Sequence, residues 1–282
     1  MRFAFKRVLG YLVGFLFFYE PFMLFSLLTN SFLVEMDFTS IHVPCARIPL
    51  ASIFTGQWEN IGPTSLLFCI LLVISSLWFG PLFCGRLCPA GAFSEYLSNI
   101  LPDKYKMDLN QLVAIVPLRY GFFAGYLFSM VLGLGYPCVY CNYYAFELFI
   151  GYLNTGQLLT NSLSLVLTFF VSNIILGTFT KGGRGYCNFL CPVGTFCSIF
   201  HVLGRYFPYT YCMQIKKAQC VGCGLCIKKC PMRAINIQTS KPVIDRHLCI
   251  ICGQCQHFCP NKSITYSCNR KERETRLWKE ER

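Results

Sequence analysis

Hydrophobic positions gather in four long stretches in the first two thirds of the chain, and polar positions gather in the last third. The stretches are Val8–Leu28, Thr64–Phe83, Leu112–Gly135 and Leu158–Thr178. Each has about 20 mostly apolar residues, the length that an α-helix needs to cross about 30 Å of hydrocarbon. The pattern therefore predicts an all-α transmembrane four-helix domain over residues 1–195.

Basic residues are distributed unevenly around these stretches. They occur before the first stretch and after the second and fourth, whereas the other two connecting loops contain only Arg47. Because basic loops favour the inner side of a membrane, we expect a multi-pass protein of the cytoplasmic membrane with both termini and the polar C-terminal part in the cytoplasm. The first apolar run has no small-residue cleavage site, so we expect a retained helix and not a signal peptide.

One cysteine motif, C-x3-C-P, occurs twice, at residues 84–89 and 187–192, each time at the end of an apolar stretch. The repetition predicts duplicated helical hairpins whose inner ends face each other. The four cysteines are Cys84, Cys88, Cys187 and Cys191. We expect them to meet and hold an iron–sulfur cluster, with Arg86 and Arg184 offsetting its negative charge. The alternatives are a structural role and a redox-active thiol site.

The polar C-terminal part contains two C-x2-C-x2-C-x3-C-P runs that begin 29 residues apart, at Cys220 and Cys249. In bacterial two-cluster ferredoxins the fourth cysteine of each run ligates the other cluster. The two predicted [4Fe–4S] sites are therefore Cys220, Cys223, Cys226 and Cys259, and Cys249, Cys252, Cys255 and Cys230. Zinc is the alternative, but paired C-x2-C zinc units need no fourth cysteine before a proline.

The cysteine runs and their flanks divide the rest of the chain. Residues 216–268 are expected to form a small α+β bacterial-ferredoxin-like domain, with strands near 234–237 and 263–266. An interfacial linker is expected over 196–215, and a charged tail over 269–282. The net charge of +12 is spread over loops and this tail without one basic face, so we exclude nucleic acid as a partner.

Three further cysteines lie in the loops expected on the outer face: Cys45, Cys138 and Cys141. With one more ligand, such as His42, they are candidates for an outer metal or iron–sulfur site. A disulfide between Cys138 and Cys141 is the alternative, because that compartment is oxidising.

The four apolar stretches, the paired C-x3-C-P motifs and the two cysteine runs together resemble the NapH family of membrane-bound ferredoxin-type proteins, relatives of the NosR and CcoG polyferredoxins. The resemblance implies an electron-transfer subunit of an oxidoreductase complex that links the quinone pool to a redox partner. Glu20 is a candidate proton acceptor for quinol oxidation, since a carboxylate within an apolar span is costly and usually functional. Arg119 is expected to pair with it or to extend towards the membrane surface.

Two other functions fit the same features. One is a transmembrane conduit that carries electrons from a cytoplasmic donor to an extracytoplasmic reductase through the outer cysteines. The other is a membrane anchor that docks a partner enzyme. Whether the chain is itself an enzyme stays open. It contains neither a nucleotide-binding glycine motif nor a nucleophile–base pair, so we expect any chemistry beyond electron transfer to belong to a partner.

Overall fold

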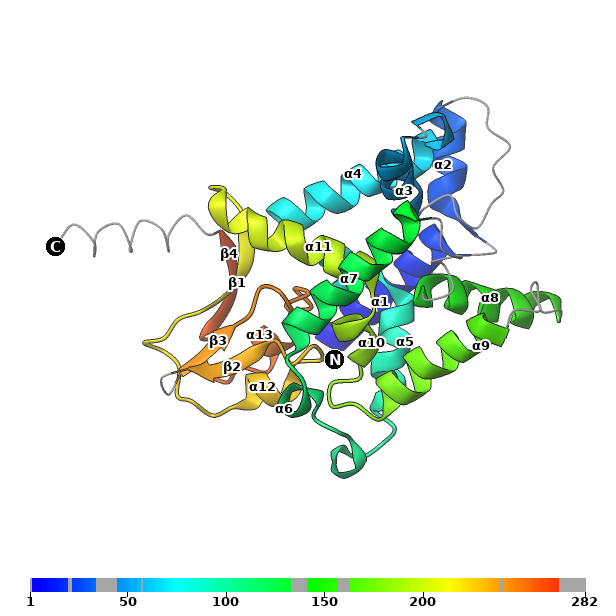
Figure 1. Ribbon diagram of the computed structural model, residues 1–282. Helices are drawn as coiled ribbons and strands as arrows, with labels where there is room; N and C mark the ends of the chain where they lie inside the picture. The colour runs from blue at the N-terminus through cyan, green and yellow to red at the C-terminus, as the bar shows by residue number, and fades with distance from the viewer. Residues whose placement is uncertain are drawn as a thin grey trace.

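Helices make up most of the described part of the first two thirds of the chain (Figure 1). The computed structural model describes residues 2–19, 22–33, 45–56, 58–132, 141–156, 163–238 and 241–268. The helices are α1 (Arg2–Phe18), α2 (Leu24–Leu33), α3 (Arg47–Thr55), α4 (Pro63–Trp78), α5 (Pro89–Ser98), α6 (Leu109–Leu112), α7 (Ile115–Val131), α8 (Asn142–Thr155), α9 (Leu163–Phe169), α10 (Gly185–Phe189) and α11 (Pro192–Leu203). Two π-helical segments, η2 (Phe83–Leu87) and η5 (Phe170–Thr178), precede α5 and α10. Short 3-10 turns are η1 (Trp58–Asn60), η3 (Asp103–Tyr105) and η6 (Gly204–Tyr206).

The prediction of a transmembrane four-helix domain is wrong. Among the residues that the structure describes, no helix combines the length and the apolar character needed to cross a membrane. The first stretch is divided between α1 and α2, and the fourth between α9 and η5. Helix α4 has 16 residues and ends before Gly80-Pro81, which at 1.5 Å per residue gives about 24 Å. The same finding overturns the predicted multi-pass localisation in the cytoplasmic membrane and the assignment of inner and outer faces.

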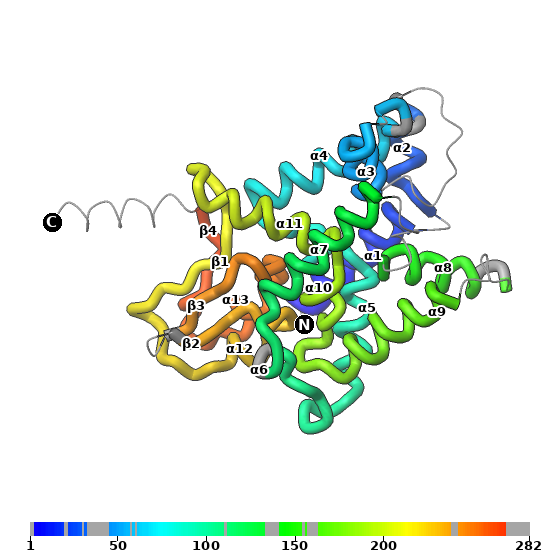
Figure 2. Tube along the Cα trace, in the orientation of Figure 1, coloured from blue at the N-terminus to red at the C-terminus, as the bar shows by residue number. Residues whose placement is uncertain are grey.

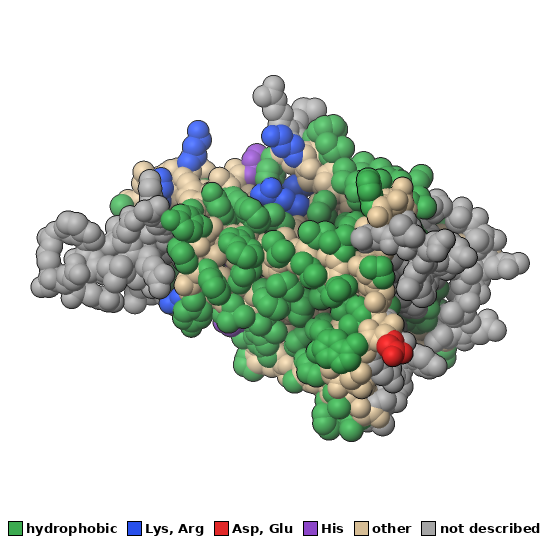
Figure 3. Space-filling view, turned by 90° about the horizontal axis from the view of Figure 1, so that it is seen from above, with side chains coloured by type: hydrophobic (Ala, Val, Ile, Leu, Met, Phe, Trp, Pro, Cys, Tyr) green, Lys and Arg blue, Asp and Glu red, His purple; other side chains and the backbone are tan. Residues whose placement is uncertain are grey.

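Much of the apolar sequence lies on the surface of the molecule. Figure 3, seen from above Figure 1, shows hydrophobic side chains over a large part of that face. Helix α4, whose inner side packs along α11, exposes a stripe on its outer side. The stripe consists of Leu66, Ile70, Leu71, Ile74 and Trp78, each at least 40% exposed. The spacing of three to four residues is that of one helix face.

The ferredoxin-like part consists of two short helices and two small antiparallel sheets. The helices are α12 (Leu225–Lys229) and α13 (Gln254–His257), and the strand pairs are β1 (Tyr211–Ile215) with β4 (Ile264–Cys268), and β2 (Ile235–Gln238) with β3 (Lys241–Ile244). Strands β2 and β4 lie where the sequence predicted strands. Figure 2 shows this part beside α6, α7 and α10.

The ferredoxin-like part and the helices share one hydrophobic core. Its buried side chains include Met232, Ile250 and Ile251 of the former and Ile115 and Phe189 of the latter. The two parts approach closely at Gly85, where a Cβ atom would lie 2.0 Å from the backbone oxygen of Ile250. Only a glycine permits that approach. The linker predicted over 196–215 is the end of α11, the turn η6 and strand β1.

Candidate iron–sulfur sites and their charged surroundings

The first predicted ferredoxin site forms a solvent-open cavity of about 520 Å³ at the edge of the ferredoxin-like part. Its lining includes Cys220, Cys223, Cys226 and Cys259, so the fourth cysteine comes from the other run, as the sequence predicted. Gly222 and Gly224 have φ values of +72° and +71°, which turn the chain tightly enough for three cysteines to face one space. Cys223 is exposed to solvent.

The second predicted site is a cavity of about 330 Å³ deeper in the same part. It is lined by Cys230, Cys249, Cys252 and Cys255, again with one cysteine from the other run. Cys230 and Cys255 are both 8% exposed, and the Cys230 sulfur accepts a hydrogen bond from the backbone N–H of Ala234 at 3.3 Å. Burial, followed by the neighbouring Cys252, raises the pKa of Cys230 to about 12.

The two C-x3-C-P motifs also come together. The chain repeats one arrangement, in which the first cysteine lies in η2 or α10 and the second directly precedes α5 or α11. Burial raises the pKa of Cys88 to about 12, with further contributions from Cys187 and Cys84. Burial, then Cys187, Cys84 and Cys88, raises that of Cys191. Four enclosed thiols that oppose one another's ionisation need a cationic group among them to become thiolates.

We call the four cysteines of the two motifs, Cys84, Cys88, Cys187 and Cys191, the quartet. Two buried arginines lie beside it, Arg184 at 1% and Arg119 at 0% exposure. Arg184 donates a hydrogen bond from Nη1 to the backbone oxygen of Cys84 at 2.8 Å. Arg119 donates from Nε to Thr195 at 3.1 Å, while its Nη2 has no hydrogen-bond partner among the described residues. Both guanidinium groups counteract the rise in the pKa of Cys84 and Cys187.

The structure brings one of the two arginines expected to offset the charge of a cluster to these four cysteines. Arg184 lies at the quartet, but Arg86 is exposed to solvent. The second arginine beside the quartet is Arg119. Arg119 is buried and does not extend to a surface. The sequence signal for Arg119 is an arginine inside an otherwise apolar helix.

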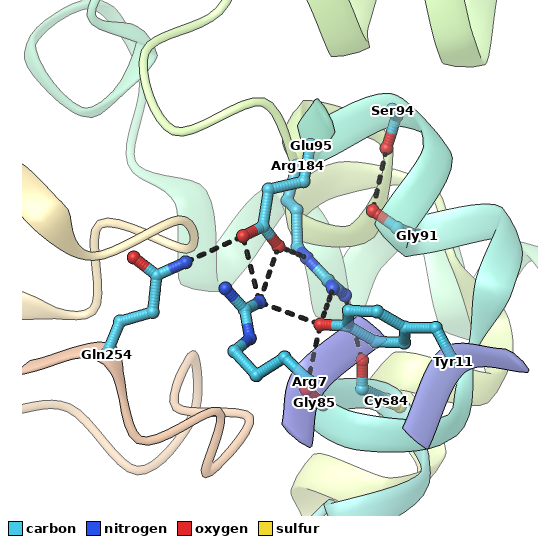
Figure 4. A network of polar contacts seen from close by, with 9 residues as sticks. All are labelled: Arg7, Tyr11, Cys84, Gly85, Gly91, Ser94, Glu95, Arg184 and Gln254. Atoms are coloured by element: carbon cyan, nitrogen blue, oxygen red, sulfur yellow. Dashed lines mark hydrogen bonds and ion pairs between the residues drawn. The ribbon is translucent and has the colours of Figure 1, made fainter. Parts of the chain in front are cut away.

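A buried charge network joins the quartet to the ferredoxin-like part (Figure 4). Glu95 of α5 accepts hydrogen bonds from Arg7 at 2.8 Å, from Arg184 at 2.7 Å and from the side chain of Gln254 at 2.7 Å. The Tyr11 hydroxyl accepts from both arginines, at 2.7 and 3.1 Å, and donates to the backbone oxygen of Gly85 at 3.0 Å. Sequence reasoning missed this network, although Glu95 is the only acidic residue between Glu59 and Asp103.

The cysteine sets fit clusters better than single ions. Over the described ranges, no three His, Cys, Asp or Glu side chains are close enough to share one metal ion. A zinc site needs four ligands at about 2.0–2.3 Å from one atom, whereas a cluster of four irons and four sulfides holds its thiolates further apart. A set of four thiolates per site is also the ligand set of a [4Fe–4S] cluster.

Two of the three cysteines predicted on an outer face share a cavity of about 560 Å³. Cys45 and Cys141 line it together with Arg47 and with aromatic side chains that include Phe123, Tyr126, Tyr143, Tyr144 and Phe196. Pro192 and Val193, which follow Cys191, line it too. This pair therefore lies beside the quartet and not a membrane thickness away. Cys138, His42 and the predicted proton acceptor Glu20 fall outside the described residues.

Comparison with known proteins finds two families. The family described as "4Fe-4S binding domain" matches residues 61–108 and 163–208, each of which contains one C-x3-C-P motif. The family described as "4Fe-4S dicluster domain" matches residues 212–260, which contain both cysteine runs. Both descriptions name the cluster that the cysteine spacing predicted.

Three curated proteins are similar to this chain, and the names of two of them describe an electron transport or a ferredoxin-type protein. YccM of Escherichia coli, whose name describes an electron transport protein, is 23% identical over 64% of this chain and 50% of its own. The uncharacterised protein MJ0750 of Methanocaldococcus jannaschii is 31% identical over 58% of this chain and 64% of its own. The methylamine utilization ferredoxin-type protein MauN of Methylobacillus flagellatus is 26% identical over 65% of this chain and 59% of its own. The chain thus spans between half and two thirds of the length of these relatives. No solved structure matches it.

Proposed function

We propose that the chain is a ferredoxin-type iron–sulfur electron-transfer protein that holds three [4Fe–4S] clusters and connects a quinol to a redox partner protein, as an electron-transfer subunit of an oxidoreductase complex. This is the role that the resemblance to NapH-type proteins implies. The observation that carries the proposal is the shared hydrophobic core. Cysteines of all three sets pack in it, among them Cys226, Cys259, Cys230, Cys255, Cys84 and Cys187.

The closeness of neighbouring sets supports a continuous route. A Cβ atom on Gly85, next to Cys84, would lie 3.1 Å from the backbone nitrogen of Cys252. Arg184 interacts electrostatically with both Cys252 and Cys187. A bound [4Fe–4S] cluster would supply a centre that accepts and releases one electron at a time. Because the residues bring the second ferredoxin site against the quartet, no long gap separates them.

The aromatic cavity beside the quartet supports the quinol end of the proposal. Small-molecule sites are mostly apolar, with a few polar groups that fix orientation. Aromatic side chains supply flat walls for a quinol ring, and Arg47 supplies a polar group. Oxidation of one quinol to a quinone releases two electrons and two protons. We propose that Glu20 accepts these protons, and the Glu20→Gln variant tests this role in the quinol reduction assay described below.

A second candidate function uses the same cavity differently. Cys45 and Cys141 would hold a fourth metal or iron–sulfur centre, which makes the cavity an extra redox position and not a quinol site. The convergence of two cysteines almost a hundred residues apart on one cavity favours this reading.

Iron analysis and quinol reduction together test these proposals. Anaerobically purified protein should contain about twelve iron atoms per chain, and the Cys84→Ser/Cys187→Ser variant about eight, as expected for the loss of one four-iron cluster. The Cys69→Ser variant, which changes a buried cysteine outside the three sets, should keep all twelve. A soluble quinol analogue should bleach the visible absorbance of the wild type and not of the double variant. Eight iron atoms in the wild type, or bleaching that survives in the double variant, would refute the three-cluster relay. An iron content above twelve that falls in Cys45→Ser would support the fourth centre.

A further inference from the structure

The most exposed of the three cysteine sets is surrounded by positive charge. Lysines that are exposed to solvent lie directly before, between and after its ligands: Lys216, Lys217, Lys228, Lys229 and Lys262. Asp245 is the only acidic residue from Arg205 to Cys268. Its carboxylate is half-buried and accepts a hydrogen bond from the backbone N–H of His247 at 2.8 Å.

Two hydrogen bonds bring together the segment that carries Lys216 and Lys217 and the segment that carries Lys262. The Lys216 N–H donates to the backbone oxygen of Ser263 at 2.8 Å, and the Asn261 side chain donates to the backbone oxygen of Gln219 at 3.4 Å. These bonds place the turn that carries Lys262 against the turn that precedes Cys220. The lysines of this part therefore surround the first cysteine set as one surface, which differs from the expectation from the sequence that the positive charge has no single basic face.

Exposed apolar side chains occupy the middle of this surface. Val221 and Ile237 are 65% and 63% exposed, and Leu225 is 39% exposed. All three line the same cavity as Cys223. An apolar centre with a charged rim is the usual composition of a protein–protein contact, and here the centre lies over the ligand set nearest to solvent.

We propose that this surface, defined by Val221, Leu225, Ile237 and the five lysines around them, is the docking site of a small acidic electron-carrier protein. The proposal rests on the proposed electron-transfer function and names the class of its protein partner. The lysines are not explained as groups that offset the negative charge of a cluster in the first ferredoxin site. The arginines that do so at the quartet, Arg119 and Arg184, are buried and counteract the rise in the pKa of Cys84. The lysines, by contrast, are exposed to solvent. Opposite charges on two such surfaces speed encounter and fix orientation, and redox contacts of this kind are small and short-lived.

Binding of a plant-type ferredoxin, a small acidic protein, tests the proposal without relying on electron transfer. The labelled ferredoxin is titrated with the cluster-loaded full chain, and fluorescence anisotropy gives Kd as a function of salt concentration. The Lys216→Glu/Lys228→Glu variant is compared with the control Lys6→Glu/Arg205→Glu, which changes the net charge by the same amount at exposed positions elsewhere. Iron content is measured in each, so that only variants with the wild-type content are compared.

The Lys216→Glu/Lys228→Glu variant of the basic surface should bind the ferredoxin about tenfold more weakly than the wild type at low salt. The control variant should bind it within about twofold of the wild type. The difference should disappear near 1 M salt, where charges are screened beyond about 3 Å. Equal weakening in both variants, or no weakening in either, would overturn the proposal. Tighter patch-dependent binding of a single-stranded oligonucleotide than of the ferredoxin would overturn it too. Patch-dependent ferredoxin binding by a protein that a quinol never reduces would keep this inference and reject the proposed function.

Discussion

Replacement of Glu95 by glutamine should loosen the junction between the ferredoxin-like part and the helices. Glu95 is 4% exposed and interacts with Arg7 and Arg184 at 2.8 and 2.7 Å. A carboxylate only accepts hydrogen bonds, and all its partners here are N–H donors. A glutamine of the same shape turns its NH2 group towards one of these donors, so at least one bond becomes a repulsive contact.

The magnitude follows from the burial of both arginines. Loss of one partner from a buried ion pair costs about 3–5 kcal/mol, because the remaining charge is left enclosed without compensation. In Glu95→Gln two guanidinium groups are left, and both still contact the Tyr11 hydroxyl. With a urea dependence of about 1–3 kcal/mol per molar, the midpoint of unfolding should fall by about 1 M or more.

Anaerobic urea titration measures this effect, with the visible absorbance of the clusters and intrinsic fluorescence as separate signals. The midpoint is the appropriate quantity, since unfolding with bound cofactors is not two-state. Glu59→Gln makes the same chemical change at an exposed position and should shift stability by no more than about 0.5 kcal/mol. If the two variants unfold at the same urea concentration, the charge network does not hold the junction together and the reasoning fails.

Three further changes test other parts of the structure. Gly85→Ala should lower cluster content and the urea midpoint together, because its Cβ would lie 2.0 Å from the Ile250 oxygen; normal content with an unchanged midpoint would contradict that approach. Burial, then the charges of Arg246 and His247, lowers the pKa of His201 to about 3. As the pH falls from about 6.5 to about 3, the unfolded chain binds the proton first, so wild-type stability should fall by up to about 1.4 kcal/mol per pH unit and His201→Phe should lack that slope. Arg119→Met should lower the reduction potential of the proposed cluster at the quartet, because a buried positive charge favours the reduced form. An EPR-monitored redox titration measures this potential. An unchanged potential would show that Arg119 does not influence the cluster.

The cysteine spacing predicted which cysteines share a site, and the structure places the same two sets around two cavities. The spacing carries this signal because the order of ligands along the chain is a local property. Three cysteines, each separated from the next by two residues, face one space when glycines such as Gly222 and Gly253 turn the backbone. The exchange of the fourth cysteines follows from the two strand pairings. The pairing of β1 with β4 brings Cys259 towards Cys220, and the pairing of β2 with β3 brings Cys230 towards Cys249.

The hydrophobic pattern predicted helices that are too long, because it does not detect the residues at which a helix ends. Average hydropathy over 20 residues treats the stretch from Thr64 to Phe83 as continuous, yet Gly80 takes a φ of +77° and Pro81 follows. A left-handed glycine and a proline end a helix whatever the hydropathy of their neighbours. The charge network was equally hidden, since Arg7, Glu95 and Arg184 are far apart in sequence and no local pattern links them.

The shared core makes the sequence boundary between helices and ferredoxin-like part a poor guide to independent units. The backbone from Ile250 to Cys252 occupies the space beside Gly85, where another residue would have a side chain. Gln254 donates a hydrogen bond to Glu95. Separation of residues 216–268 from the rest would expose Met232, Ile250 and Ile251, each at most 3% exposed in the whole chain, and would leave Arg7, Glu95 and Arg184 at a newly wetted surface. The same contacts that bury these groups also bring Cys252 next to Cys84. Stability and electron-transfer geometry therefore depend on one interface, and a change that weakens it should affect both together.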